Sequence, residues 1–328
     1  MTTTADVLPR RELGRSGVLV TRLMFGGAPI GGLFAPVSSA QAAATLEAAW
    51  AAGVRAFDTA PHYGVGLSER RLGAFLTSQP RDEFVICTKV GRLLVPASGQ
   101  VDGNEGFYGT PHLTRVRDYT PAGVRASLEA SLERLGLDRI DIALIHDPEA
   151  HRQQAVGEAY PALAQLRSDG VIRAIGIGMT QVRLLEWFLP RTDLDCVLIA
   201  GRYTLLDTSA GMTLLPECKR RGVGVLAGGV FNSGILVDPR PGATFDYKPA
   251  DPVLLSRAQR IQLECARRGL ASGALAQQFV LRNPAVTAIV VGARSPEEIT
   301  LDTDQVRTPI PEAVFAELAA AGIIPATR

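Results

Sequence analysis

The chain has 328 residues, of which 46% are hydrophobic and 20% are charged. This composition supplies enough apolar side chains for a large buried core and excludes an intrinsically disordered chain. Lysine and arginine together number 34 against 33 acidic residues, which gives a formal net charge of +1. Such a balance, without a long run of like charge, excludes an electrostatic basis for binding nucleic acid or an anionic membrane surface.

Four cysteines lie far apart in the chain, three of them in or beside apolar stretches: Cys87, Cys196, Cys218 and Cys265. We expect free, packed thiols, and neither a disulfide framework nor a metal site. Residues 1–14 lack the apolar core of a secretory signal, and no apolar run approaches the roughly 20 residues of a membrane span. A soluble, cytoplasmic protein is therefore expected.

In chain order, a possible hairpin at residues 10–20 is followed by short β-rich apolar segments that alternate with longer segments of helical periodicity. Eight strands are predicted at 22–26, 56–58, 85–89, 140–145, 174–177, 196–199, 224–227 and 288–291. Helices are predicted at 38–53, 67–78, 120–136, 153–170, 180–190, 208–222, 251–269, 272–284 and 295–302. Several of these helices begin with Ser or Thr and end at Gly, as helix termini prefer.

Eight strand and helix alternations with fully apolar strands favour a parallel sheet that closes on itself. The predicted fold is therefore α/β, a (β/α)8 TIM barrel with an N-terminal hairpin, and residues 1–328 are expected to form one domain. The alternative is an open doubly wound sheet, which would have fewer strands and would require a glycine fingerprint after the first one.

Two segments interrupt the alternation. Residues 91–119 carry no predicted element and are too long for an ordinary connection, so we expect a structureless functional loop over one mouth of the barrel. Residues 232–251 are rich in Pro and Gly and follow the seventh strand, which makes them a candidate lid.

Common nucleotide and hydrolase motifs are absent or misplaced in the sequence. Gly222, Gly224 and Ala227 match the spacing G-x-G-x-x-A, but the match enters a strand, whereas a phosphate site requires it to leave a strand and open a helix. We interpret these as turn glycines around a buried strand. The chain has no P-loop, H-E-x-x-H or G-x-S-x-G motif, so metal-dependent, nucleotide and serine hydrolysis lose their usual support.

Four polar residues occupy the C-terminal ends of the second, third and fourth predicted strands: Asp58, Tyr63, Lys89 and His146. Active sites of (β/α)8 barrels are built at this edge, so these side chains are expected to meet. Each residue alone has an ordinary structural explanation. Together they are harder to explain structurally, because Lys89 and His146 each follow a buried apolar run and would need partners to offset burial.

Proton transfer at a carbonyl or carbinol, coupled to hydride transfer, suits this set. An ammonium beside a phenol lowers the phenol pKa, which would make Tyr63 a general base for oxidation and a general acid for reduction. Asp58 would pair with Lys89 and offset its burial. His146 would donate a hydrogen bond to the substrate oxygen.

The chain resembles the aldo-keto reductases in residues 10–30, 57–73 and 288–299, and the likeness extends over nearly the whole length. The resemblance implies a (β/α)8 barrel, a nicotinamide-dependent oxidoreductase and a catalytic tetrad at Asp58, Tyr63, Lys89 and His146. It also implies cofactor contacts after the later strands, at Gly178, Met179, Thr180, Gly228, Phe231, Asn232, Gly234, Gly292, Arg294, Ser295, Glu298 and Asp302. Several of these positions depart from the family pattern, such as Gly228 where an aromatic residue commonly stacks on the nicotinamide.

The loop at residues 290–302 bears on the choice between NAD and NADP. Family members that favour NADP tend to carry a cation at the position that corresponds to Glu298. A carboxylate there would repel a 2′-phosphate and tolerate a ribose hydroxyl. We therefore expect NAD in preference to NADP, with Arg294 as the opposing cation.

Within the family, residues 146–149, 199–207 and 229–236 are similar to sugar 1-dehydrogenases of the L-fucose or D-threo-aldose type, and a pyridoxal 4-dehydrogenase branch is similar too. The sugar likeness implies oxidation of an aldose at C1 to the aldonolactone, with Asp147, His112, Arg202 and Asn232 contacting the sugar. Alternatives are a pyridoxal dehydrogenase, an NADPH-dependent aldehyde or ketone reductase, and a non-catalytic cofactor-sensing subunit. The oligomeric state is left open.

Overall fold

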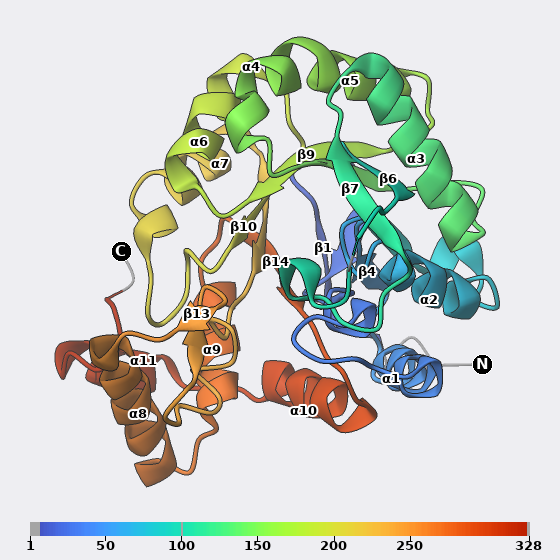
Figure 1. The fold of residues 1–328 in the computed structure, drawn as a ribbon. Helices are drawn as coiled ribbons and strands as arrows, with labels where there is room; N and C mark the ends of the chain where they lie inside the picture. Colours follow the sequence, from blue (N-terminus) through green and yellow to red (C-terminus); the bar gives the residue numbers. More distant parts are fainter. Residues whose placement is uncertain (1–6, 100, 327–328) are drawn as a thin grey trace.

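A computed structural model of the chain describes residues 7–99 and 101–326. Its centre is a closed barrel of eight parallel strands (Figure 1), which confirms the predicted fold. In chain order these strands are β3 (Leu23–Gly26), β4 (Ala56–Asp58), β5 (Val85–Val90), β8 (Ile142–His146), β9 (Ala174–Met179), β10 (Cys196–Ala200), β11 (Gly224–Gly228) and β14 (Val286–Val291). Consecutive strands are neighbours, and β14 closes the barrel against β3.

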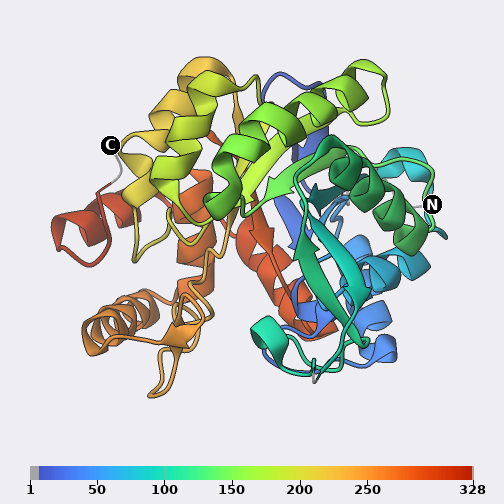
Figure 2. The same cartoon turned by 45° about the horizontal axis from the view of Figure 1, so that its top comes forward.

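Helices surround the barrel on its outside (Figures 1 and 2). They are α1 (Ser39–Ala51), α2 (Leu67–Leu76), α3 (Pro121–Leu135), α4 (Arg152–Gln154), α5 (Tyr160–Ser168), α6 (Val182–Phe188), α7 (Leu214–Arg221), α8 (Pro252–Arg267), α9 (Ser272–Leu281), α10 (Pro296–Arg307) and α11 (Glu312–Ala320). A π-helical turn at 155–159 joins α4 to α5. Helix α11 was not predicted from the sequence.

Side chains alternate between the two faces of each barrel strand, and this alternation decides which residues face the interior. Inward residues such as Ala56, Cys87 and Leu144 form one buried cluster inside the barrel. Outward residues such as Phe57 and Ile145 pack in a second cluster with the helices. The last inward position of β4, β5 and β8 is therefore the place where a polar side chain reaches the barrel mouth.

The predicted N-terminal hairpin is present as antiparallel β1 (Arg10–Glu12) and β2 (Leu19–Thr21), and it closes the end of the barrel opposite this mouth. Leu13, at its turn, is fully buried and belongs to the interior cluster. Gly14 follows with a φ of 60°. A β-carbon at Gly14 would lie 2.3 Å from the carbonyl oxygen of Asp195, so this tight contact requires glycine.

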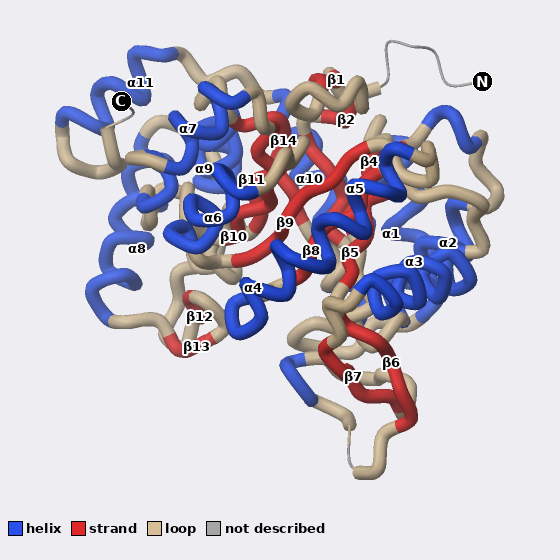
Figure 3. Tube along the Cα trace, turned by 90° about the horizontal axis from the view of Figure 1, so that it is seen from above, coloured by secondary structure: helices blue, strands red, loops and turns tan. Residues whose placement is uncertain are grey.

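Residues 91–119 are not structureless, and the expectation of a bare loop was wrong. They contain an antiparallel hairpin of β6 (Arg92–Pro96) and β7 (Leu113–Arg117). A smaller hairpin of β12 (Thr244–Phe245) and β13 (Lys248–Pro249) lies within the candidate lid segment. Both hairpins lie at the end of the barrel opposite β1 and β2 (Figure 3). Beyond the ends of the parallel strands, antiparallel pairing within each hairpin satisfies the backbone hydrogen-bonding groups.

All four cysteines are buried free thiols. Among the described residues no helix has the length and apolar character needed to cross a membrane. In the same part of the chain, no group of three or more His, Cys, Asp or Glu side chains is arranged to hold a metal ion. Residues 1–6 of the leader, on which part of the signal-peptide prediction depends, lie outside the described residues.

Candidate active site

A cavity of about 310 Å³ opens at the C-terminal mouth of the barrel. It begins at Asp58 and Tyr63 and extends to the loop that precedes α10. Its remaining lining residues are Gly26, Ala28, Pro29, Leu33, Phe34, Thr180, Leu198, Ala200, Gly201, Gly228, Gly229, Val230, Phe231, Asn232, Ser233, Gly234, Asp246, Tyr247, Val290, Val291, Gly292, Arg294 and Glu298.

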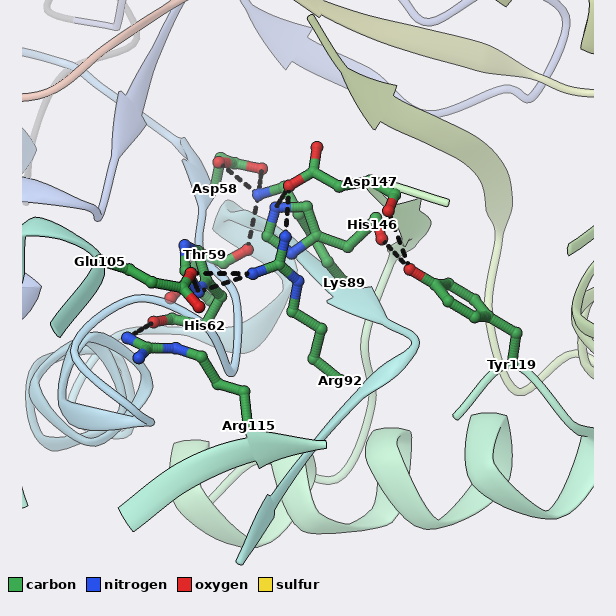
Figure 4. Close-up of polar contacts among 10 residues, drawn as sticks. All are labelled: Asp58, Thr59, His62, Lys89, Arg92, Glu105, Arg115, Tyr119, His146 and Asp147. Atoms are coloured by element: carbon green, nitrogen blue, oxygen red, sulfur yellow. Dashed lines mark hydrogen bonds and ion pairs between the residues drawn. The ribbon is translucent and has the colours of Figure 1, made fainter. Parts of the chain in front are cut away.

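Asp58 and Lys89 form a buried ion pair at the base of this mouth (Figure 4). The Lys89 ammonium donates to both carboxylate oxygens of Asp58 and to the Thr59 carbonyl, each at 2.8 Å. Lys89 is 1% exposed and Asp58 is 2% exposed. Removing either partner would leave an uncompensated buried charge, which is why the pair stays together. This pairing confirms the contact predicted from the sequence.

The Tyr63 ring lies next to this pair. Lys89 Nζ is 4.6 Å from the Tyr63 ring centroid. Burial raises the pKa of the Tyr63 phenol, and the positive charge of Lys89 lowers it but does not outweigh the burial. The sequence-based expectation of a net lowered pKa was therefore wrong in direction, because desolvation of the phenolate exceeds the stabilisation by one ammonium that is already paired with Asp58.

His146 ends β8 and completes the set. Its ring centroid lies 6.0 Å from that of Tyr63, with the two rings nearly perpendicular. Burial, followed by the charge of Arg92, holds the pKa of His146 well below its ordinary value, so the imidazole is neutral. A neutral imidazole carries one N–H and can donate one hydrogen bond. The four residues that the sequence singled out thus meet at one edge of the barrel.

A second group lies beside the tetrad and comes mainly from the segment 91–119 (Figure 4); apart from Asp147, sequence reasoning missed its members. Arg92 Nη1 contacts His62 Nδ1 at 3.0 Å and Glu105 at 3.3 Å, and its Nη2 donates to Asp147 Oδ2 at 2.6 Å. Arg115 donates to the His62 carbonyl at 2.9 Å. The only local signal was that His62 immediately precedes Tyr63, since the cations arrive through a hairpin that the sequence did not reveal.

The expected cofactor residues divide into two groups. Eight line the cavity: Thr180, Gly228, Phe231, Asn232, Gly234, Gly292, Arg294 and Glu298. Gly178 faces the barrel interior, where an added β-carbon would lie 3.8 Å from Lys89 Cε. Met179, at the next position along β9, packs in the outer cluster, because side chains alternate along a strand. The structure therefore turns the Met179 side chain away from the cavity.

The cavity fits a nicotinamide dinucleotide in two respects. Asn232 is 2% exposed, and its Oδ1 has no hydrogen-bond partner among the described residues. Such an orphaned buried acceptor suits a carboxamide N–H. Gly228 lines the cavity without a side chain, so a ring can approach its backbone, and a β-carbon there would already be in van der Waals contact with Ala200 and Leu198 at 3.6 Å. Residues at the mouth could therefore hold the nicotinamide ring, with its amide group, and the rest of the dinucleotide attached to it.

The loop before α10 closes the far end of the cavity. Ser295 is the N-cap of α10 and accepts a hydrogen bond from the Glu298 N–H at 3.3 Å. Glu298 in turn accepts from the Arg294 backbone N–H at 2.7 Å, and its carboxylate lies 3.5 Å from the Arg294 guanidinium. Asp302 does not line the cavity: it is 9% exposed and accepts from Gln277 of α9 at 3.4 Å.

The expected substrate residues are also separated. Asn232 lines the cavity, whereas Asp147 does not and lies 3.4 Å from His146 Nε2. Arg202 is engaged by Asp246 at 2.5 Å and by Asp207 at 3.3 Å. His112 is exposed and precedes β7, at the end of the hairpin away from Arg92. The structure does not bring His112 to the cavity.

The candidate lid does reach the cavity. Asn232, Ser233, Gly234, Asp246 and Tyr247 line its wall. The Tyr247 ring lies 5.6 Å from that of Phe34, which comes from the loop after β3. Two aromatic rings from segments distant in the sequence thus meet over the mouth.

Comparison with known proteins agrees with this geometry. Residues 22–323 match the model of the Aldo/keto reductase family. The chain is 43% identical to D-threo-aldose 1-dehydrogenase of a Pseudomonas species, over 94% of this chain and 96% of that protein. It is 39% identical to pyridoxal 4-dehydrogenase of Microbacterium luteolum, over 96% and 98%.

Among solved structures, a glycerol dehydrogenase from Gluconobacter oxydans superposes with a TM-score of 0.77 at 25% identity, covering 99% of this chain and 98% of that one. The family match spans most of the chain, and the two sequence relatives, both dehydrogenases, align with it over nearly their whole lengths. The chain is therefore an oxidoreductase of the aldo/keto reductase family.

Proposed function

We propose that this protein oxidises an aldose at C1 to the aldonolactone with NAD as the hydride acceptor. The observation that carries the proposal is that the Lys89–Asp58 ion pair lies beside Tyr63 and near the neutral His146, with Asp58 and Tyr63 on the wall of the cavity. The sugar as substrate is supported by the 43% identity to a D-threo-aldose 1-dehydrogenase.

In this proposal the side chains handle the proton while the cofactor, when bound, supplies the acceptor for the hydride from C1. Tyr63 in its phenolate form takes the proton of the anomeric hydroxyl as the C1–O bond becomes a lactone carbonyl. His146 donates a hydrogen bond to the same oxygen and orients it. Lys89 stabilises the phenolate by charge, and Asp58 holds the ammonium in place. Asn232 and Asp147 are the proposed contacts for further sugar hydroxyls.

We propose NAD over NADP from the loop before α10. Glu298 lines the cavity and contacts Arg294 through both the backbone and the side chain. The Arg294 cation is thus already engaged, and a carboxylate beside a 2′-phosphate would repel it. A ribose with two free hydroxyls would instead find an acceptor there.

Steady-state oxidation of L-fucose, D-arabinose, L-galactose and L-xylose, each with NAD and with NADP, tests this function. Absorbance of the reduced cofactor gives kcat/KM for every pair. We expect at least one aldose to be oxidised with NAD, and with NADP at a lower kcat/KM. Turnover of simple aldehydes with NADPH alone, and of no sugar, would reject the proposal.

Pyridoxal is a second candidate substrate, because four aromatic side chains line the cavity: Phe34, Tyr63, Phe231 and Tyr247. Aromatic rings that line a cavity favour a flat heteroaromatic substrate. The 39% identity to a pyridoxal 4-dehydrogenase supports the same candidate. Adding pyridoxal to the same panel distinguishes the two, since the preferred substrate has the higher kcat/KM with NAD.

A further inference from the structure

The two ends of the segment 91–119 both contact the C-terminal end of β8 and the residue that follows it. At one end, Arg92 donates to the Asp147 carboxylate at 2.6 Å. At the other, the Tyr119 hydroxyl lies 2.6 Å from the His146 carbonyl and 3.0 Å from the Asp147 carbonyl. The base of the hairpin therefore holds the active-site histidine by its backbone and its neighbour by its side chain (Figure 4).

Gly91 makes this arrangement possible. Its φ is 102°, and a β-carbon there would lie 2.2 Å from the Tyr119 ring. Only glycine adopts this backbone and admits the ring so close. The chain can therefore turn sharply at the end of β5 and bring Arg92, three residues after Lys89, back over the mouth, where Arg92 is 6% exposed.

The contact between Arg92 and His62 fixes a tautomer. A guanidinium only donates hydrogen bonds, so His62 Nδ1 accepts from Arg92 Nη1 at 3.0 Å rather than donating to the more distant Glu105 Oε2 at 3.4 Å. The single proton of a neutral imidazole then lies on Nε2. Burial, followed by the charges of Arg92, Arg115, Lys89 and Arg117, lowers the pKa of His62 to about 2, which agrees with a neutral ring.

The contact between Arg92 and Asp147 affects the other histidine. Asp147 Oδ2 lies 2.6 Å from Arg92 Nη2 but 3.4 Å from His146 Nε2. The guanidinium thus holds the carboxylate beyond good hydrogen-bond distance of the imidazole. A proton on His146 Nε2 is consequently available to a substrate oxygen, while Nδ1 is buried without a partner among the described residues.

We propose that Arg92 is a positioning residue that fixes the hydrogen-bonding states of both histidines beside Tyr63. It keeps His62 as the Nε2–H tautomer and keeps the Asp147 carboxylate from capturing the N–H of His146. The two imidazole centroids lie 5.5 Å apart. Two donors beside one phenol suit a substrate with two neighbouring oxygens, such as the anomeric hydroxyl and ring oxygen of an aldose, and this last step rests on the proposed function.

Histidine NMR tests the proposal without relying on turnover. The chain has four histidines, so long-range ¹H–¹⁵N correlation of protein labelled at histidine resolves every ring, with His62→Gln and His146→Gln to assign two of them. In the wild type we expect His62 to show a single Nε2–H pattern from pH 6 to 8. In Arg92→Met we expect a mixture of tautomers at His62 and shifted ¹⁵N signals at His146.

Activity gives the second readout. Arg92→Met should lower kcat by about 100-fold, as expected when reacting groups are misplaced, with the KM for the cofactor unchanged. Arg92→Lys keeps the charge but cannot reach both partners, so it should restore little activity. Arg125→Met, an exposed arginine on α3, is the matched control and should leave spectra and kcat at wild-type values.

Arg92→Met leaves Asp147 without its cation and could impair folding, so Arg92→Met combined with Asp147→Asn provides a charge-balanced second variant for the His62 spectrum. A wild-type His62 that is protonated or in the Nδ1–H form at pH 7 would overturn the proposal. Unchanged His62 signals in both variants would do the same. If no sugar in the panel is oxidised, the spectra still decide the role of Arg92, while the proposed function fails separately.

Discussion

Lys89 influences Tyr63 through its charge. Its ammonium has three N–H donors, and the three acceptors at 2.8 Å belong to Asp58 and Thr59. Tyr63 is held 4.6 Å away, measured from the ammonium to the ring centroid, where the charge of Lys89 lowers the pKa of the phenol while burial and the charge of Asp58 raise it. The phenol is therefore protonated at neutral pH, ready to act as an acid, and must lose its proton before it can act as a base.

This protonation state predicts a pH dependence. Because burial raises the pKa of Tyr63 above its ordinary value of about 10, the phenolate fraction increases tenfold per pH unit through the neutral range. We expect kcat/KM for sugar oxidation to rise with pH from 7 to 9, and carbonyl reduction to stay flat over the same range. An oxidation profile that is flat or falls there would contradict Tyr63 as the base.

Substitution of Tyr63 tests its role directly. Tyr63→Phe keeps the ring and removes only the hydroxyl, so we expect oxidation to fall by about 10²–10⁴-fold, the usual contribution of a positioned acid or base. Binding of the cofactor, measured by fluorescence, should be unchanged. A variant with wild-type turnover would contradict Tyr63 as the acid or base, whereas cofactor binding without turnover in both proteins would support the non-catalytic, cofactor-sensing alternative.

Glu298 is the residue on which the cofactor preference depends. Glu298→Gln keeps the N3 hydrogen-bonding role at the start of α10 and removes the negative charge. Arg294 would then be free to meet a 2′-phosphate, and we expect the KM for NADP to fall by about fivefold, equivalent to roughly 1 kcal/mol for an exposed ion pair. The KM for NAD should change less than twofold. Glu297→Gln, which lies outside the cavity lining, is the control, and equal effects of both variants would exclude the assigned role.

At the scale of elements, Asp302 belongs to the contact between α9 and α10. It accepts a hydrogen bond from Gln277 Nε2, and Gln277 Oε1 has no partner among the described residues. Burial, followed by the charge of Glu298, raises the pKa of Asp302 to about 7. A protonated Asp302 carboxyl would be a donor as well as an acceptor, so this side chain serves helix packing in the structure rather than the expected cofactor contact.

The raised pKa predicts how stability depends on pH. In the unfolded chain Asp302 ionises above about pH 4, whereas in the folded chain it stays neutral up to about pH 7. The unfolding free energy should therefore fall as pH rises through this window, by about 4 kcal/mol at most. Asp302→Asn should remove this dependence and be the more stable protein at pH 8. Urea unfolding at pH 5 and 8 measures it, with the exposed Asp304→Asn as control; an equal pH dependence in wild type and Asp302→Asn would contradict it.

At the scale of the whole molecule, the two ends of the barrel have different roles. The β1–β2 hairpin fills one end with apolar side chains, and the β6–β7 and β12–β13 hairpins surround the catalytic mouth at the other (Figure 3). This separation is typical of (β/α)8 enzymes, in which loops at the C-terminal ends of the strands carry function and the opposite face carries stability.

The hairpin end offers a test of this division. Leu13→Ala removes a fully buried side chain from the interior cluster, and we expect the unfolding free energy to drop by about 2–5 kcal/mol. kcat at 25 °C should stay within twofold of the wild type, because the catalytic residues lie at the opposite end. A large loss of kcat in a variant that remains folded would show that the two ends are coupled.

The sequence by itself determined the eight-stranded barrel and the meeting of Asp58, Lys89 and His146. Both depend on local patterns: apolar runs set the strands, and a period of two turns the last polar residue of each strand inward. Even the error over residues 91–119 has a local cause, since β6 and β7 lack a clear apolar alternation and are partly exposed.

Only the tertiary structure decided the surroundings of those residues. Arg92 meets His62 and Asp147, and Asp302 turns into a helix interface. The tertiary structure also decided the direction of the Tyr63 pKa shift, because desolvation depends on every neighbour around the phenol and not on Lys89 alone. Such contacts join segments that come together only when the chain closes, so no local pattern encodes them.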